Sequence, residues 1–213
     1  MGRGGRGRAR SAASRRAGAD PRRRLRHRTP RGRARHARHE LVLLEPVAAM
    51  LEQARSRLPL ARAVPSSLEA APLVDPVDAA VCRGVLNDIT EDTGRDAALA
   101  ALARVVRPGG ALVVDVRERD ATAARYRDRR TLRKEAGDVT FTSVGRWDER
   151  AGVVRVLERH EAAGRAAEHD FVMRPWTEEE LHDRLARAGF REVEIAPGGG
   201  EGRGDRRLVT ASR

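Results

Sequence analysis

The sequence predicts an α/β fold, in which helices cover both faces of a mainly parallel sheet. Short apolar runs alternate with apolar residues at helical spacing between residues 41 and 115. Such alternation is typical of right-handed strand–helix–strand units. A length of 213 residues suits one domain with a tail. The first 40 residues share none of this periodicity, so we assign the domain to residues 41–213.

The predicted elements of residues 41–115 follow from the spacing of apolar residues. Continuous apolar runs indicate buried strands, and helical spacing indicates helices that face a core. The Pro-Gly-Gly sequence at 108–110 ends the second helix, because neither residue type continues one. In chain order, we expect a strand over 41–45, a helix over 47–58, a weak strand over 61–64, a strand over 78–82, a helix over 92–106 and a strong strand over 111–115.

The alternation stops after residue 115. Three runs, over 139–144, 153–158 and 170–173, suit strands, and the first two are separated by a polar turn sequence that contains Gly152. Consecutive strands joined by short turns pair with their neighbours, so we expect an antiparallel meander inserted after the sheet strand.

The C-terminal part returns to helix and strand. Thr177 and Glu180 form a capping box that opens a helix, and Gly189 ends it. Residues 192–195 and 207–210 are candidate closing strands. They would complete the sheet that the earlier strands begin.

Charge divides the chain into two parts. Fifteen arginines against Asp20 and Glu40 give residues 1–40 a net charge of +13, whereas the remaining residues carry −1 of the overall +12. This segment has one large aliphatic side chain, Leu25, and no aromatic one, so it cannot bury enough apolar area to fold. We therefore expect residues 1–40 to be disordered and to contact nucleic acid only through non-specific charge attraction.

Composition excludes several classes of protein. No apolar run reaches the roughly 20 residues that a membrane helix needs, and no apolar segment of a secretory signal is visible. The single cysteine, Cys82, excludes a disulfide framework. His36 and His39 have helical spacing but lie in an arginine run, so we expect no metal site. These observations predict a cytoplasmic protein.

Several sequence landmarks follow one another from residue 41 onwards. They are Glu45 at a strand end, Met50-Leu51 with Ala54-Arg55 in the next helix, Val81-Cys-Arg-Gly-Val-Leu-Asn-Asp88, Val106-Arg-Pro-Gly-Gly-Ala-Leu112, Phe171-Val-Met-Arg-Pro-Trp-Thr177 and Leu185-Ala-Arg-Ala-Gly-Phe190. In this order and at these spacings they resemble the class I S-adenosylmethionine-dependent methyltransferases of the small-molecule type. The resemblance covers about residues 41–213 and implies a Rossmann-like sheet with the meander inserted after its fifth strand.

The resemblance implies S-adenosylmethionine as cofactor, bound beyond the carboxyl ends of the strands, where open α/β sheets take their ligands. Glu45 would accept hydrogen bonds from both ribose hydroxyls. Its alternative role is that of an acid favoured by the dipole of the next helix. Ser67 stands where the family has an adenine-binding acid, or Glu69 if the register slips. The implied cofactor residues are Glu45, Ser67, Leu68, Cys82, Arg83 and Gly84.

Cys82 and two of the implied acceptor residues have structural alternatives. Cys82 alone is more typical of a small buried core residue. Asn87 and Asp88 could orient an acceptor group or cap the helix that follows, and the sequence favours neither. Arg174 and Trp176 would stand at the mouth of the pocket, where a charge beside an aromatic ring suits a charged acceptor. The implied acceptor residues are Asn87, Asp88, Asp115, Arg117, Arg174 and Trp176.

The sequence departs from the family in its first 40 residues. The family's first strand lies between the second and fourth strands, and a glycine-rich loop follows it and approaches the methionine part of the cofactor. No strand and glycine loop of that kind occurs in residues 1–40. Without the strand, the sheet is split and two buried edges lose their hydrogen-bond partners, a conflict that is unusual in a natural sequence.

A shift of reading frame would account for this loss. Codons that encode residues 21–30 can, when read from their second base, encode Leu-Asp-Val-Gly-Cys-Gly-Thr-Gly-Arg, which is the family's strand and loop motif. We hypothesise that residues 1–40 are translated out of frame and that the correct frame is regained near residues 38–41. The nucleotide sequence of the gene decides this, because a second frame that lacks the motif or carries stop codons would refute it.

The resemblance implies methyl transfer from S-adenosylmethionine to a small-molecule acceptor. Proximity and alignment supply much of the catalysis in an in-line displacement, so no catalytic residue is predicted. The choice between O-, N- and C-methylation stays open, as does the activity of a chain without the glycine loop. The alternative is a non-catalytic protein that associates with nucleic acid through the arginine-rich arm.

Overall fold

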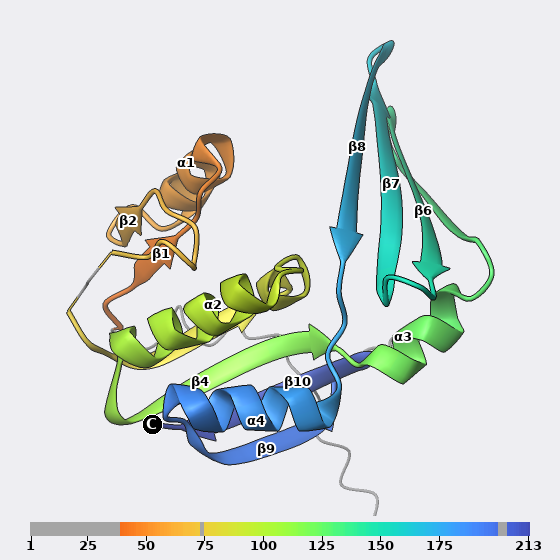
Figure 1. Cartoon of the computed structure of the whole chain (residues 1–213). Coiled ribbons are helices and arrows are strands. Elements are labelled where there is room, and N and C mark those ends of the chain that lie inside the picture. Colours follow the sequence, from red (N-terminus) through yellow and green to blue (C-terminus); the bar gives the residue numbers. More distant parts are fainter. Residues whose placement is uncertain (1–38, 73–74, 200–203) are drawn as a thin grey trace, which may run out of the picture. The chain divides into compact units, whose positions relative to one another are not determined.

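The computed structural model describes residues 39–72, 75–199 and 204–213 (Figure 1). The predictions of disorder and of nucleic-acid contact for residues 1–40 therefore fall almost wholly outside the described residues. His39–Arg213 group together as one unit. Within it, the mixed α/β fold is confirmed. No described helix is long and apolar enough to span a membrane.

The first strands form a small parallel sheet of their own. β1 (Val42–Leu44) pairs in parallel with β2 (Arg62–Val64), and α1 (Ala48–Arg57) connects them. This is the strand–helix–strand unit that the apolar spacing predicts, with boundaries that differ from the expected ones by a few residues at most. Leu51 is the buried residue of α1.

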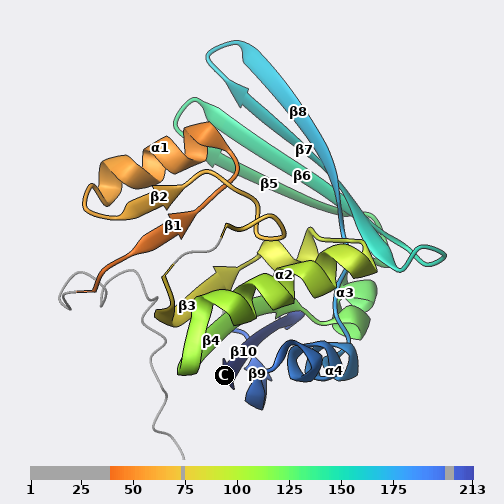
Figure 2. The same cartoon turned by 60° about the vertical axis from the view of Figure 1, so that its left-hand side comes forward.

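A second, mixed sheet contains most of the core. Its order is β3-β4-β10-β9, where β3 and β4 run parallel and β10 runs antiparallel to both of its neighbours. The two helices α2 and α4 contact each other as well as this sheet (Figures 1 and 2). The elements are β3 (Val77–Arg83), α2 (Asp92–Val105), β4 (Val106–Arg117), α4 (Glu178–Ala188), β9 (Arg191–Pro197) and β10 (Arg206–Ser212).

The signals for the start and end of α4 are confirmed, whereas the turn predicted at residues 108–110 is wrong, because these residues belong to β4. Thr177 is the N-cap of α4 and its hydroxyl accepts a hydrogen bond from the backbone of Glu180, while Gly189 ends the helix with a φ of 96°. Gly110 follows α2 at a place where a Cβ would lie 2.8 Å from the carbonyl oxygen of Asp78. That close approach of β4 to β3 requires a glycine, so the Pro-Gly-Gly sequence has a structural role.

The third sheet is an antiparallel meander of four strands, one more than the sequence predicts. Its order is β5-β6-β7-β8, with α3 (Arg119–Tyr126) between β4 and β5. The unexpected strand is β5, whose side chains are all exposed and mainly polar, so no apolar alternation marks it. The strands are β5 (Arg130–Ala136), β6 (Val139–Asp148), β7 (Val153–Ala162) and β8 (Arg165–Met173).

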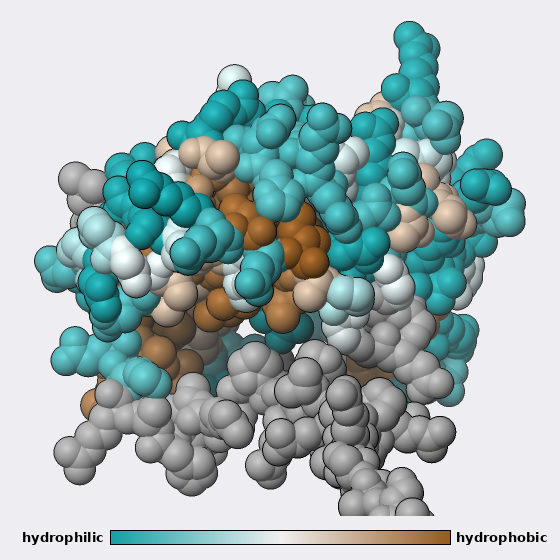
Figure 3. Space-filling view, turned by 90° about the horizontal axis from the view of Figure 1, so that it is seen from below, coloured by the Kyte–Doolittle hydropathy of each residue, from teal (hydrophilic) through white to brown (hydrophobic). Residues whose placement is uncertain are grey.

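The parallel strands are divided between two sheets in the part of the chain that the structure describes. Among the described residues, β1 pairs only with β2, and β3 pairs only with β4. Strands of parallel sheets are normally buried on both faces, yet Val81 in the middle of β3 is 65% exposed and Val42 and Leu44 of β1 are also exposed. Figure 3 shows apolar side chains gathered at the surface on one face of the molecule. The described chain therefore has open, apolar strands where the family has one continuous sheet.

Arg95 of α2 forms hydrogen bonds with three other segments of the chain, which contain Ile89, Arg174 and Glu180. It is fully buried, its Nη1 donates to both carboxylate oxygens of Glu180 at 3.0 and 3.1 Å, and its guanidinium lies 3.9 Å from the ring centroid of Trp176. It also donates to the carbonyl oxygens of Ile89 and Arg174. Burial lowers the pKa of Arg95 to about 10, with the Glu180 charge opposing the shift, so the group stays protonated at neutral pH.

Replacing Arg95 with methionine should destabilise the fold strongly. The substitution keeps an unbranched side chain against Trp176 but leaves two buried carbonyl groups without a donor and Glu180 without its buried partner. Loss of one member of a buried pair costs about 3 kcal/mol or more, measurable as a lower midpoint in urea denaturation. Arg133→Met, which removes an exposed pair with Glu135, should stay within about 0.5 kcal/mol of the original chain. Equal effects of the two changes would refute the role of Arg95.

Candidate methyl-transfer site

The predicted cofactor residues lie where β1, β2 and β3 end. Glu45 directly follows β1, and its Oε1 accepts a hydrogen bond from the backbone N–H of Val47 at 2.9 Å. That bond supports the alternative role of Glu45 at the start of α1. Its Oε2 has no partner among the residues that the structure describes, so one carboxylate oxygen stays open for a hydroxyl group. Ser67 and Leu68 follow β2 and are half-buried, and Leu68 packs against the core.

The loop after β3 is attached to the end of β4. Gly84 adopts a φ of 77°, which favours glycine, and its N–H donates to the carbonyl of Asp115 at 3.3 Å. A 3-10 turn over Val85–Asn87 follows. The Oδ1 of Asn87 accepts a hydrogen bond from the backbone of Arg117 at 2.8 Å. These hydrogen bonds therefore hold the loop against the carboxyl ends of β3 and β4.

Cys82 is a core residue in the structure. It is 8% exposed and belongs to the apolar cluster beneath α2. Burial raises the pKa of its thiol to about 12, and the nearby Asp115 charge adds to the shift. The thiol is therefore neutral at physiological pH, in agreement with the core alternative.

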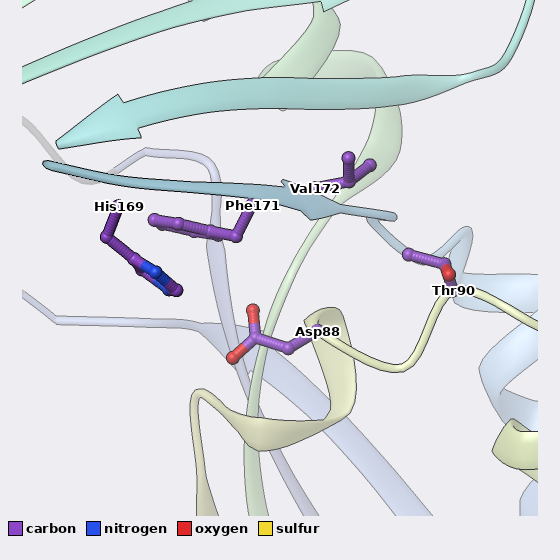
Figure 4. Close-up of a pocket in the computed structure, with 5 residues that line it drawn as sticks. All are labelled: Asp88, Thr90, His169, Phe171 and Val172. Carbon is purple, nitrogen blue, oxygen red and sulfur yellow. The ribbon is translucent and has the colours of Figure 1, made fainter.

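Asp88 lies in the wall of a hollow of about 450 Å³ beside the meander. The hollow is also lined by Thr90 and by three residues of β8, namely His169, Phe171 and Val172. The rings of His169 and Phe171 are stacked, with centroids 5.6 Å apart. Figure 4 shows the carboxylate of Asp88 pointing towards these rings from the opposite wall. The hollow thus combines a carboxylate with an aromatic wall.

Burial acts on the ionisation of Asp88. Partial desolvation raises the pKa of its carboxyl group, against the opposing charges of Arg206 and Arg117. The helix-capping alternative is not seen, because the N-cap of α2 is Glu91. Asp88 is exposed at the hollow, so it can meet a ligand there.

The other predicted acceptor residues take part in internal contacts. Asn87 is 2% exposed and connects β4 with the segment after β8. Asp115 pairs with Arg206, and Arg117 pairs with Asp205. Trp176, expected at the pocket mouth, is 1% exposed instead, because its ring covers Arg95 and its indole N–H donates to a backbone carbonyl.

Arg174 also differs from the expected arrangement. Its guanidinium pairs with Asp92 at 2.9 Å and with Glu180 at 3.3 Å, so it connects α2 and α4. Of the six predicted acceptor residues, the structure brings Asp88 alone into the hollow. Sequence reasoning missed His169 and Phe171, although their alternation on a predicted strand was a usable signal.

Comparisons with known proteins show which proteins the chain is similar to. The model of the methyltransferase domain family called Methyltransf_11 matches residues 29–114. An amino pentose methyltransferase from Micromonospora echinaspora, solved with S-adenosylmethionine, is 26% identical, with a TM-score of 0.61 over 82% of this chain and 74% of that one. Residues 29–114 thus match a methyltransferase domain, and the chain has the fold of S-adenosylmethionine-dependent methyltransferases. The predicted enzyme class and S-adenosylmethionine as its cofactor are thus confirmed.

Two further solved structures have the same fold as this methyltransferase domain. An S-adenosylmethionine-dependent methyltransferase from Clostridium acetobutylicum is 12% identical, with a TM-score of 0.67 over 82% of this chain and 75% of that one. The sugar N-methyltransferase KedS8 from a Streptoalloteichus species is 21% identical, with a TM-score of 0.65 over 81% and 70%. No curated protein sequence matches the chain.

The thiol of Cys82 should be almost unreactive in the folded methyltransferase domain. A rise of the pKa from 9.0 to about 12 lowers the thiolate fraction at pH 8 by about a thousandfold. Alkylation by iodoacetamide, followed by mass spectrometry, should therefore be far slower in buffer than in 8 M urea. Similar rates in both would show that the side chain is exposed.

Proposed function

We propose that this methyltransferase domain transfers a methyl group to the amino nitrogen of a small molecule, and that an amino sugar is the class of acceptor. The main observation that supports this proposal is the hollow in which the carboxylate of Asp88 faces the rings of His169 and Phe171. A carboxylate attracts an ammonium group, and aromatic faces stabilise it further. The names of the related amino pentose and sugar N-methyltransferases support the same acceptor class.

Asp88 suits the proton transfer that an amine acceptor needs. An amine attacks only with a free lone pair, so its ammonium form must first lose a proton. The raised pKa of Asp88 makes its carboxylate a better proton acceptor than an ordinary aspartate. S-adenosylmethionine, when bound, supplies a methyl group on a sulfonium, which leaves as a neutral thioether when the nitrogen forms its new bond to carbon.

Glu45 is the proposed anchor of the cofactor. Its open Oε2 at the end of β1 suits a ribose hydroxyl, and hydrogen bonds to a charged group are among the stronger ones in proteins. Ser67, Leu68, Arg83 and Gly84 stay proposed cofactor contacts on the basis of their positions at strand ends. Cys82 would act only through packing beneath that loop.

The proposed function is tested by cofactor binding followed by turnover. S-adenosylhomocysteine at about 100 times its Kd should stabilise a true binder by about 2.7 kcal/mol, seen as a thermal shift. A second-frame chain, in which Leu-Asp-Val-Gly-Cys-Gly-Thr-Gly-Arg replaces residues 21–29, should bind more tightly, because it contains the family's glycine loop. Methylation of glucosamine, with glucose as control, then tests the acceptor class. Turnover of glucose but not of glucosamine would refute an amine acceptor.

Glu45→Gln should weaken binding of S-adenosylhomocysteine. Removing the charge from a hydrogen bond to a ligand costs about 1.5–3 kcal/mol, or roughly 10- to 150-fold in Kd. Titration calorimetry on the second-frame chain measures this change, and the melting temperature without ligand should stay nearly constant. Glu52→Gln on the exposed side of α1 is the matched control. Unchanged affinity in Glu45→Gln would remove this residue from the site.

A further inference from the structure

A second hollow, of about 410 Å³, lies on the meander and is lined by three arginines, Arg129, Arg146 and Arg155. In the ladder of β6 and β7, Arg146 stands directly opposite Arg155. Like charges in directly opposed positions destabilise a sheet. Two arginines at such a position, beside a third in the same hollow, therefore need a compensating negative charge.

The described residues compensate only one of these three arginines. Arg155 pairs with Asp148 at 3.0 Å. Arg129 and Arg146 make no ion pair within residues 39–72, 75–199 and 204–213. Arginines farther along the same sheet are paired, as Arg133 is with Glu135. Two arginines without an ion pair among the described residues, Arg129 and Arg146, thus lie in the same hollow.

The chemistry of the hollow suits a phosphate group on a small molecule. Guanidinium groups bind phosphate with two parallel hydrogen bonds, and they do so better than a lysine. The volume falls in the range of small-ligand pockets, and aliphatic side chains of Val144 and Leu157 flank the arginines. Asp170 also lines the hollow and sets one negative charge against its three arginines.

Phe171 and Val172 line both this hollow and the one that contains Asp88. They are neighbours on β8, which is the last strand of its sheet, so their side chains point to opposite faces. A ligand that passes round this edge can occupy both hollows. We propose that the arginine hollow binds a phosphate group of the methyl acceptor while the acceptor's amine lies beside Asp88. This inference rests on the proposed function and adds a phosphorylated amino sugar as the acceptor class.

The binding test uses inorganic pyrophosphate and the full chain, by titration calorimetry at low salt. Arg146→Ala and Arg129→Ala should each weaken binding at least tenfold, and Arg146→Lys should weaken it less because the charge is kept. Arg133→Ala, on the same sheet but outside the hollow, should bind like the original chain. Equal loss in Arg133→Ala, or no loss in Arg146→Ala, would overturn the site.

The turnover test separates this inference from the proposed function. Glucosamine 6-phosphate should be methylated with a lower KM than glucosamine, and Arg146→Ala should remove that advantage without changing affinity for S-adenosylhomocysteine. If S-adenosylhomocysteine binds neither the original chain nor the second-frame chain, the proposed function fails, while the pyrophosphate result still stands. A single-stranded oligonucleotide that binds more tightly than pyrophosphate, and depends equally on Arg146, would overturn the small-molecule assignment.

Discussion

The buried guanidinium of Arg95 holds together the two walls of the acceptor hollow. One of its bonds goes to the carbonyl of Ile89, which directly follows Asp88, and another goes to the carbonyl of Arg174, which directly follows β8. Asp88 and the β8 side chains come from segments about 80 residues apart in the sequence. A rigid planar fork with several donors can fix both segments at once. Arg95 therefore helps to fix the position of the carboxylate relative to the aromatic wall, together with the bond from the backbone of Arg174 to the carbonyl of Asn87.

The divided sheet affects the two halves of the proposed site differently. The hollow that contains Asp88 is lined by the segment after β3 and by β8. The proposed cofactor residues Glu45 and Ser67 follow β1 and β2, which the described residues join to no other strand. Among the described residues β3 pairs with β4 alone, so its other edge is open to a further strand. A reading frame that supplies a strand at that place would thus act on cofactor binding far more than on the acceptor hollow.

Strong periodic signals predicted most of the fold. Apolar runs located β1, β2, β3 and β4, and the capping box at Thr177 located α4 to within a residue. β5 escaped prediction because its polar side chains are exposed and only pairing with β6 defines it as a strand. The site was harder to predict, because contacts between residues far apart in the sequence decide which polar side chains are available to bind a ligand. The sequence suggested Arg174 and Trp176 as pocket residues. In the structure, Trp176 packs against the buried guanidinium of Arg95, and Arg174 pairs with Glu180, which is also the partner of Arg95.

Arginine supplies nearly all the basic charge of this chain, with Lys134 as the one lysine. The same residue type satisfies buried carbonyls at Arg95, forms exposed pairs at Arg133, and stands beside a like charge at Arg146. Composition cannot separate these roles, because each depends on what the strand register or the helix packing places opposite the guanidinium. A local excess of positive charge can be recognised only after the arginines that form ion pairs are left out of the count. On the meander, the opposed pair of Arg146 and Arg155 stands out among these positions, because a sheet that only needed to fold would place opposite charges there.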